Sequence, residues 1–433
     1  MRRFFLITIL LFIHIVVFAS VTHSTDLTLN DLFALALKNS ERIMIAEEEF
    51  FIAERGKEKA LSALLPKFTA FSNYTRYTQD RRSSAGSIIQ PEESSSWGLR
   101  IEQPLFTGGR NIAGLEIAKG QVEAERKSLS FFKEDYLFQV ASVYFDVLKG
   151  RRNVEIGESQ VRRLLKHRKA AEIRLKVGEV TKTALLRAEA ELSAAESELI
   201  KAKNAYKQAK DYLARLTGIT TDYDVAGPSI SDIPQGDVKD LRMVAYQNRN
   251  DYLKSEIAVR IAKSKIKYAK GGFYPTLSLE GVYSRKEDDP ASTFLVKESI
   301  YGGLRLNFPF FEGGLRKAEL SESAAELRQA ELSHSDLKKT IDIEISNAYL
   351  DLKTIESIVI TTQKQVAYAK DNYEAVSRQF EFGLADSIDV IDANTTLLSA
   401  ERQHASAMYD RHLATLKLKK AMGIFLKVVS SGQ

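Results

Sequence analysis

Cysteine is absent from the 433-residue chain. Its absence excludes disulfide bonds, thiolate nucleophiles and cysteine-rich metal sites, and it excludes a lipid anchor on an N-terminal cysteine. Histidine is scarce, and no two histidines stand three or four residues apart, the spacing that places two metal ligands on one helix face. We therefore expect no catalytic residues, no metal site, no cofactor and no enzyme activity.

A large charge of one sign is also missing. The formal net charge is +5 at pH 7, and a balance this small favours neither nucleic acid nor an acidic partner. Beyond residue 19, no apolar run approaches the ~20 residues that a membrane-spanning helix needs. With 44% hydrophobic and 27% charged residues, the composition is that of a folded protein.

The first 19 residues have the pattern of a secretory signal peptide. Arg2 and Arg3 precede an apolar run over residues 4–18, and Ala19 supplies a small residue for cleavage. The alternative is an uncleaved membrane anchor, although the run is short for a span. We expect cleavage after Ala19, which leaves a mature chain that is periplasmic, secreted or inserted in an outer membrane as a β-barrel.

Two copies of one motif divide the chain into halves. Residues 104–110 read PLFTGGR, and residues 309–316 read PFFEGGLR, 205 positions later. We expect a first structural repeat over residues 20–225 and a second over residues 226–433. Each motif is expected to form the turn from a strand into a helix. The junction residues are Pro104, Gly108, Gly109, Pro309, Gly313 and Gly314.

Each half is expected to contribute two strands with alternating apolar and polar residues. Leu99 and Ile101 fall on one face of the second strand, and Arg100 and Glu102 fall on the other. Such alternation suits a membrane β-barrel with a wet lumen, but it also suits a soluble hairpin with one solvated face. The expected strands cover about residues 67–78, 96–105, 275–285 and 300–310.

Four strands cannot close a barrel. An open sheet edge in lipid would leave backbone groups unpaired, so a membrane barrel would have to be shared among several chains. Three chains with four strands each would supply twelve strands.

Long helical segments follow each strand pair. Residues 110–176 contain no proline. As one helix they would span ~100 Å at ~1.5 Å per residue, and this length indicates a coiled coil. In the return helices alanine recurs every seven residues, and such small residues let neighbouring helices approach closely. The alanine rows are Ala188, Ala195, Ala202 and Ala209, and Ala393, Ala400, Ala407, Ala414 and Ala421.

Each long helix is expected to end in a glycine turn at the tip of a helical hairpin, at about residues 176–183 and 381–388. Thr181 and Asp386 are suited to cap the returning helices. Asp389 and Asp392 follow on one face of the second return helix.

Two interpretations of Asp389 and Asp392 stay open. Acidic residues are favoured in the first turn of a helix by its dipole, which fits Asp389 better than Asp392. Alternatively, the two side chains from several chains form a ring of carboxylates around a pore mouth, where they would attract cations and repel anions.

Taken together, the leader, the two halves, the paired PLFTGGR and PFFEGGLR junctions and the segment 383–393 resemble the TolC-like outer membrane efflux family. The resemblance covers essentially the whole mature chain. It implies a mainly α fold with a small β part, in which long antiparallel coiled-coil hairpins join four membrane strands per chain. It also implies a homotrimer with a 12-stranded β-barrel on an α-helical barrel.

The resemblance further implies an exit duct of a tripartite efflux or type I secretion system. Such a duct lies in the outer membrane of a gram-negative cell, contacts outer-membrane lipid and has a large periplasmic part. It conducts substrates passively from an inner-membrane pump and a periplasmic membrane-fusion adaptor. Helices close its periplasmic end until the adaptor docks. The gate carboxylates map onto Asp389 and Asp392. The adaptor-contacting tips map onto Val177, Gly178, Glu179, Val180 and Thr181, and onto Gly383, Leu384, Ala385, Asp386 and Ser387.

The chain departs from the family pattern at the gate. Phe380 and Ala385 stand where a constricting tyrosine and arginine are expected, and Ala184 stands at an acidic position. Because these side chains make neither a phenolic hydrogen bond nor a salt bridge, we expect a weaker or differently built connection between the helices.

Two other protein classes remain as alternatives. A periplasmic adaptor also carries coiled-coil hairpins, but it would have a single hairpin and lipoyl-like segments. A structural coiled-coil scaffold would not need alternating strands at matching places in both halves. The sequence assigns no cargo and no role to the stretch around residues 220–240.

Overall fold

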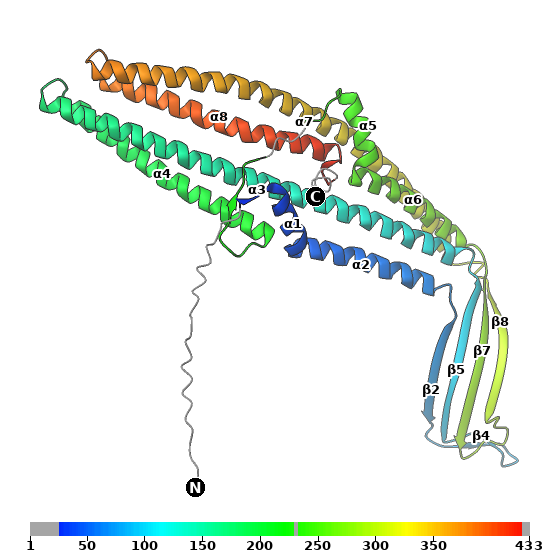
Figure 1. The fold of residues 1–433 in the computed structure, drawn as a ribbon. Coiled ribbons are helices and arrows are strands. Elements are labelled where there is room, and N and C mark those ends of the chain that lie inside the picture. Colours follow the sequence, from blue (N-terminus) through cyan, green and yellow to red (C-terminus); the bar gives the residue numbers. More distant parts are fainter. Residues whose placement is uncertain (1–25, 229–232, 427–433) are drawn as a thin grey trace, which may run out of the picture.

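The computed structural model describes residues 26–228 and 233–426. The expected signal peptide lies outside these residues. Long helices extend away from one small sheet (Figure 1), so the expected mainly α fold with a small β part is confirmed. Among the described residues, no helix has both the length and the apolar character needed to cross a membrane.

The two halves contain the same main elements in the same order. Each has a short helix, a medium helix, two long strands, a very long helix and a return helix. The first half comprises β1 (Asp26–Leu27), α1 (Leu29–Asn39), α2 (Glu41–Ser62), β2 (Lys67–Arg76), β3 (Arg81–Arg82), β4 (Ile88–Gln90), β5 (Glu93–Phe106), α3 (Arg110–Lys176), α4 (Lys182–Thr217) and β6 (Asp224–Val225). The second comprises α5 (Val238–Asn248), α6 (Asn250–Gly271), β7 (Thr276–Asp289), β8 (Glu298–Asn307), α7 (Leu315–Glu381) and α8 (Ser387–Ala421).

The strand ends differ from the predicted ranges. Strands β5 and β7 are longer than predicted. Their polar ends continue the antiparallel pairing beyond the apolar residues, as far as the pair Glu93 and Asp289. Strand β8 ends at Asn307, so Pro309, which has no backbone donor for a ladder, lies outside it. Part of the unassigned stretch near residues 220–240 forms β6, which pairs in parallel with β1.

Four strands form one antiparallel sheet in the order β2-β5-β7-β8. The register pairs Leu99 with Tyr283 and Leu279 with Leu304, so the apolar positions of neighbouring strands share one face. The large exposed side chains on this face are Phe68, Tyr74, Trp97, Leu99, Ile101, Leu279, Ile300, Leu304 and Leu306.

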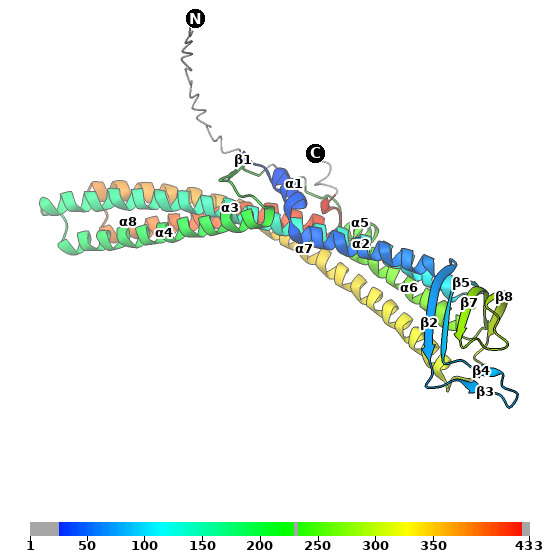
Figure 2. The same cartoon turned by 90° about the horizontal axis from the view of Figure 1, so that it is seen from below.

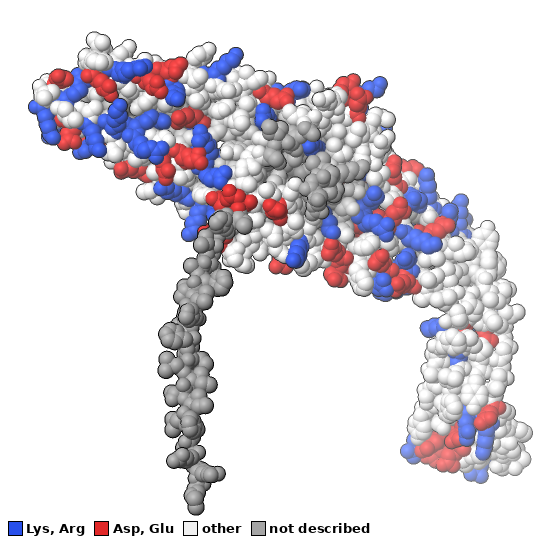
Figure 3. Space-filling model, viewed as in Figure 1, with Lys and Arg blue, Asp and Glu red and all other residues white. Residues whose placement is uncertain are grey.

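The opposite face of the sheet is charged. Glu280 is buried there between Arg100, 3.3 Å away, and Arg305, with which it forms a second ion pair. Further charges collect at the end of the sheet remote from the helices, whereas the band between them carries few charges (Figure 3). The sheet therefore has one apolar face, one polar face and a charged far end.

The main core lies halfway along α3, where α1 and the end of α4 pack against it. Leu137, Val140 and Leu148 are fully buried there among residues from both neighbours. A second core surrounds Ile341 and Ile345 of α7, where α5 and the end of α8 pack. These two cores stabilise the middle of the molecule, and the ends of the long helices α3 and α7 extend beyond them.

Two antiparallel hairpins, α3 with α4 and α7 with α8, point away from the sheet (Figures 1 and 2). Ala188, Ala195 and Ala400 are buried in the helix contacts, as the alanine rows predicted. A Cβ on Gly157 would lie 3.2 Å from the Leu199 side chain. Small residues therefore set the close approach of these helices.

Candidate functional site

The hairpin tips are built alike in both halves. Gly178 and Gly383 adopt left-handed conformations, with φ of 80° and 76°, that reverse the chain at little steric cost. The hydroxyl of Thr181 accepts from the Ala184 amide, and the Asp386 carboxylate accepts from the amides of the first turn of α8. Both returning helices therefore start at a side-chain cap.

Large apolar side chains are exposed at the tips. Phe382 and Leu384 are about four-fifths exposed, and Val177 and Ile173 are about two-thirds exposed. Single exposed apolar residues are common on protein surfaces, but a cluster at the end of a hairpin indicates a contact surface for another protein. The cluster lies at the end of the molecule opposite the sheet (Figure 1).

Asp389 and Asp392 are both exposed but have different surroundings. Asp389 closes a capping box, in which its Oδ2 accepts from the Asp386 amide at 3.0 Å while its own amide donates to Asp386. No described residue pairs with the Asp392 carboxylate. The helix-start interpretation thus accounts for Asp389, and the pore-mouth role of both residues stays a prediction.

A connection between the two hairpins lies just behind the tips. Arg174, near the end of α3, donates from Nη1 to the Phe380 carbonyl of α7 at 2.6 Å. Its guanidinium also lies 4.7 Å from the centre of the Phe380 ring and pairs with Glu179 at 2.9 Å. Phe380 itself is buried. A buried phenylalanine of one hairpin is therefore held by an arginine of the other.

His167 makes a second contact between the hairpins. Its Nε2 lies 2.9 Å from the Ser387 hydroxyl at the start of α8, and its ring packs against Phe380 with the centroids 4.9 Å apart. Burial lowers the pKa of His167 because the charged imidazolium loses solvation. The contact therefore favours a neutral histidine.

Charged side chains extend the connection further from the tips. Arg163 donates to the Asn394 side chain at 2.8 Å and pairs with Glu401, and Lys166 pairs with Glu381 at 3.1 Å. These contacts link α3 to both helices of the second hairpin. Residues more than 200 positions apart meet here, and no periodic pattern in the sequence marks them.

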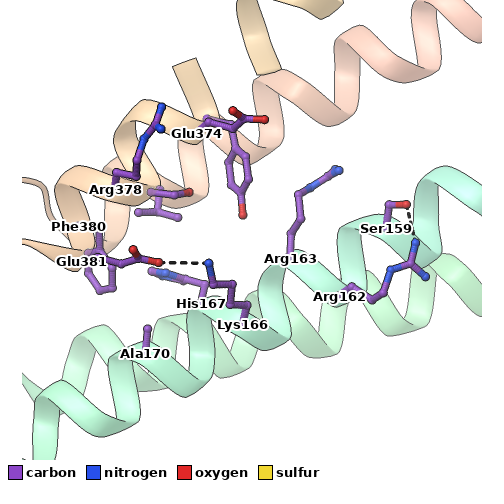
Figure 4. Close-up of a pocket in the computed structure, with 13 residues that line it drawn as sticks. Ser159, Arg162, Arg163, Lys166, His167, Ala170, Glu374, Arg378, Phe380 and Glu381 are labelled. Atoms are coloured by element: carbon purple, nitrogen blue, oxygen red, sulfur yellow. Dashed lines mark hydrogen bonds and ion pairs between the residues drawn. The ribbon is translucent and has the colours of Figure 1, made fainter. Parts of the chain in front are cut away.

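A cavity of about 510 Å³ opens between α3 and α7 next to this connection. Arg163 and Lys166 of α3 project toward the second hairpin, where Lys166 meets Glu381 of α7 (Figure 4). Arg162 of α3 and Glu374 and Arg378 of α7 also line the cavity. Cations outnumber acids on its walls. The gap between the hairpins is therefore not filled by their own side chains.

The two strand-to-helix junctions form glycine turns, as expected for such connections. Gly108, Gly109, Gly313 and Gly314 all have positive φ. A Cβ on Gly108 would lie 2.2 Å from the Gly271 carbonyl, so backbone packing requires glycine at this position. Pro104 lies inside β5 next to a register shift. Exposed aromatic residues surround the junctions, namely Phe106, Phe273, Tyr274, Phe308, Phe310 and Phe311.

The histidines of α8 make ordinary packing contacts. The Nδ1 of His404 lies 3.1 Å from the Thr362 hydroxyl, and His412 stacks on Phe145. Across residues 26–228 and 233–426, no cluster of three or more histidine or acidic side chains could hold a metal ion.

The comparisons with known proteins agree with this architecture. The family model described as "Outer membrane efflux protein" matches residues 32–219 and 241–424, one match in each half. The chain is 24% identical over 396 residues to the outer membrane efflux protein BepC of Brucella suis, covering 92% of this chain and 85% of that protein. It is 22% identical over 410 residues to the outer membrane protein TolC of Vibrio cholerae, covering 91% and 90%. Its fold matches the CmeC outer membrane channel of Campylobacter jejuni with a TM-score of 0.81 and 19% identity, covering 92% of this chain and 86% of that one.

Proposed function

The chain belongs to the outer membrane efflux protein family, and from this membership we propose that three copies form the gated exit duct of a tripartite efflux or type I secretion system. The family places the chain in the outer membrane as an efflux channel. In the proposed assembly, a periplasmic adaptor and an inner-membrane pump deliver substrates, and the duct conducts them passively to the outside.

The open edges of the four-stranded sheet support a barrel that is shared among several chains. Its edge strands β2 and β8 each have one side without a partner strand in the described chain, and its apolar face is exposed. Open edges in lipid are costly because backbone groups stay unpaired. Pairing β8 of one copy with β2 of the next would remove both edges, and three copies would supply twelve strands.

The outer helices support the same assembly. Helices α2, α3, α6 and α7 pack side by side in this order. The two end helices, α2 and α7, both carry exposed apolar side chains. These are Met44, Ile45, Phe51 and Ile52 on α2, and Leu332, Ile343 and Leu350 on α7. Contact between α2 of one copy and α7 of the next would bury them and would close a helical barrel below the strands.

The exposed aromatic residues at the strand-to-helix junctions suit a membrane interface. Aromatic rings are favoured at the level of lipid headgroups, where one end of the ring is apolar and the other is wet. Phe310 and Phe311 lie at such a junction and are at least four-fifths exposed. We place the periplasmic surface of the membrane at this level.

The hairpin tips are the proposed gate and docking site. In a trimer, Asp389 and Asp392 would contribute six carboxylates to one ring at the periplasmic mouth, where they would attract cations. The apolar tip residues Val177, Phe382 and Leu384 would contact the adaptor. The contacts of Arg174 and His167 with the second hairpin would hold the resting arrangement until docking separates the hairpins.

Single-channel recording in a planar bilayer tests the proposal. We expect discrete conductance that trivalent cations added on the periplasmic side block. The double variant Asp389→Ala with Asp392→Ala should pass more anions and resist the block. The double variant Asp80→Ala with Asp222→Ala, in which Asp80 is half-buried, Asp222 is exposed and both lie away from the tips, should not change selectivity. Unchanged selectivity in the double variant would contradict the carboxylate ring. A chain that stays soluble without detergent would contradict the channel itself.

A further inference from the structure

A second cavity lies far from the hairpin tips, where α8 ends beside the beginning of α6. The Ala421 carbonyl at the end of α8 accepts from Arg249, the residue before α6, at 3.2 Å. The cavity has a volume of about 400 Å³, a size common for small-molecule sites. Residues of α3 and α7 complete its walls.

Glu134 of α3 is the unusual residue of this cavity. The residue is only 4% exposed, and its Oε1 has no hydrogen-bond partner among the described residues. Burial raises the pKa of Glu134 to about 7, despite the opposing charges of Lys420 and Arg249. An acid without its own cation is costly to bury unless it gains a proton or a cationic partner.

The cations around Glu134 are committed to other acids. Arg249 pairs through Nη2 with Asp251 at 2.6 Å and through Nη1 with Glu344 at 2.6 Å. Lys420 pairs with Asp135, and Lys417 pairs with Asp351. Among the described residues, Glu134 therefore forms no direct ion pair with a cation of α6, α7 or α8, although Lys420 and Arg249 are close enough to lower its pKa.

Two aromatic rings line the same cavity. Phe131 and Phe138 stand one helical turn to either side of Glu134 on α3, and the Lys420 ammonium already lies 4.7 Å from the centre of the Phe138 ring. Aromatic rings attract ammonium groups and also pack against apolar groups. Asp251 and Glu344 also line the cavity but pair with Arg249. A carboxylate without an ion pair, beside two such rings, suits an organic cation better than a bare metal ion.

We propose that the cavity at the junction of α8 and α6 binds a small organic ammonium cation. The ammonium group pairs with the carboxylate of Glu134, which lines the cavity and forms no ion pair within the described residues. The apolar part of the ligand lies against Phe131 and Phe138. This site is independent of the proposed gate, because it lies inside one chain and needs no passage through a pore.

Calorimetry on the full chain in detergent, with benzylammonium as the probe, tests the site. At pH 8 we expect saturable binding of one probe per chain. Glu134→Gln should weaken binding at least tenfold, because the amide keeps the shape and removes the charge. The matched control is Glu158→Gln, on the same helix but at the surface beside Lys203, and it should leave binding unchanged.

Measurements on the unmodified chain keep the test independent of how the variant folds. Lowering the pH from 8 to 6 should weaken benzylammonium binding by roughly tenfold, because Glu134 gains a proton over this range. The neutral analogue benzyl alcohol should bind more weakly than benzylammonium at pH 8. Absence of saturable binding at pH 8 would overturn the proposal, as would equal affinity of folded Glu134→Gln for the probe.

Discussion

Arg174 and Phe380 join the ends of the two long helices through a single side chain. The guanidinium of Arg174 donates to the Phe380 carbonyl at 2.6 Å and lies 4.7 Å from the centre of its ring. The two residues are 206 positions apart, and each belongs to a different hairpin. A contact of this kind holds the hairpins together and breaks when they separate.

Replacing Arg174 should ease opening of the proposed gate. Arg174→Ala removes a charge-assisted hydrogen bond worth about 1.5–3 kcal/mol, so the open probability in single-channel recordings should rise about tenfold or more. Arg162→Ala is the control, since Arg162 lines the same cavity but hydrogen-bonds only Ser159 of its own helix. Equal open probability in both variants would show that Arg174 does not hold the gate.

Acidic pH should loosen the contact between His167 and Ser387. Because burial lowers the pKa of His167 in the folded chain, its contribution to stability is complete above its ordinary pKa of about 6.5 and is lost as the pH falls through the lowered value. Open probability should therefore rise on acidification.

His167→Gln should remove part of this pH dependence. His404 and His412 are half-buried and also have lowered pKa values, so His404→Gln serves as the control for a general effect of histidines with lowered pKa. The prediction fails if the pH profile of the channel is the same in His167→Gln as in the unmodified chain.

Asp389 and Asp392 should differ in their effects on stability. Asp389→Ala removes one half of the capping box and should destabilise the tip by about 0.5–2 kcal/mol, which thermal unfolding in detergent measures. Asp392→Ala removes a carboxylate without a described partner and should leave the unfolding temperature unchanged. Both should shift ion selectivity toward anions. A stability loss for Asp392→Ala as large as that for Asp389→Ala would refute this division.

Gly98 should be required for the sheet. A Cβ at this position would lie 2.2 Å from the Tyr283 carbonyl and 2.7 Å from the Phe71 ring, so Gly98→Ala forces β5 and β7 apart. We expect the unmodified chain to run on detergent gels as an oligomer that resists heating, and we expect Gly98→Ala to lose this oligomer. Gly303→Ala in β8 is the control, because nothing lies within 4 Å of its added Cβ. A heat-resistant Gly98→Ala oligomer would contradict the requirement.

The parts of the fold that depend on local patterns could be predicted from the sequence. The alternation of Leu99 and Arg100 predicts a strand with unlike faces, and the sheet carries these residues on opposite faces. The seven-residue alanine rows predict close helix packing, and Ala188, Ala195 and Ala400 are buried. Strand ends were less well predicted, since backbone pairing continues past the apolar residues at Glu93 and Asp289.

The connection between the hairpins could not be predicted in this way. Phe380 is buried beneath Arg174 and His167, and these three residues come from distant parts of the sequence. Likewise, the sequence around Glu134 does not indicate that this buried acid forms no ion pair within the described residues. The nearby cations Arg249 and Lys420 come from distant parts of the chain and pair with Asp251 and Asp135.

The sequence by itself determined the two repeats, the strand-to-helix turns, the long helices and their hairpin tips, because propensity, periodicity and turn chemistry act over a few neighbouring residues. Only the tertiary structure decided which side chains of α3 meet those of α7 and α8, and which charges are paired or left alone. These outcomes depend on distances between residues that are about a hundred or more positions apart, and they follow from how the two halves pack together.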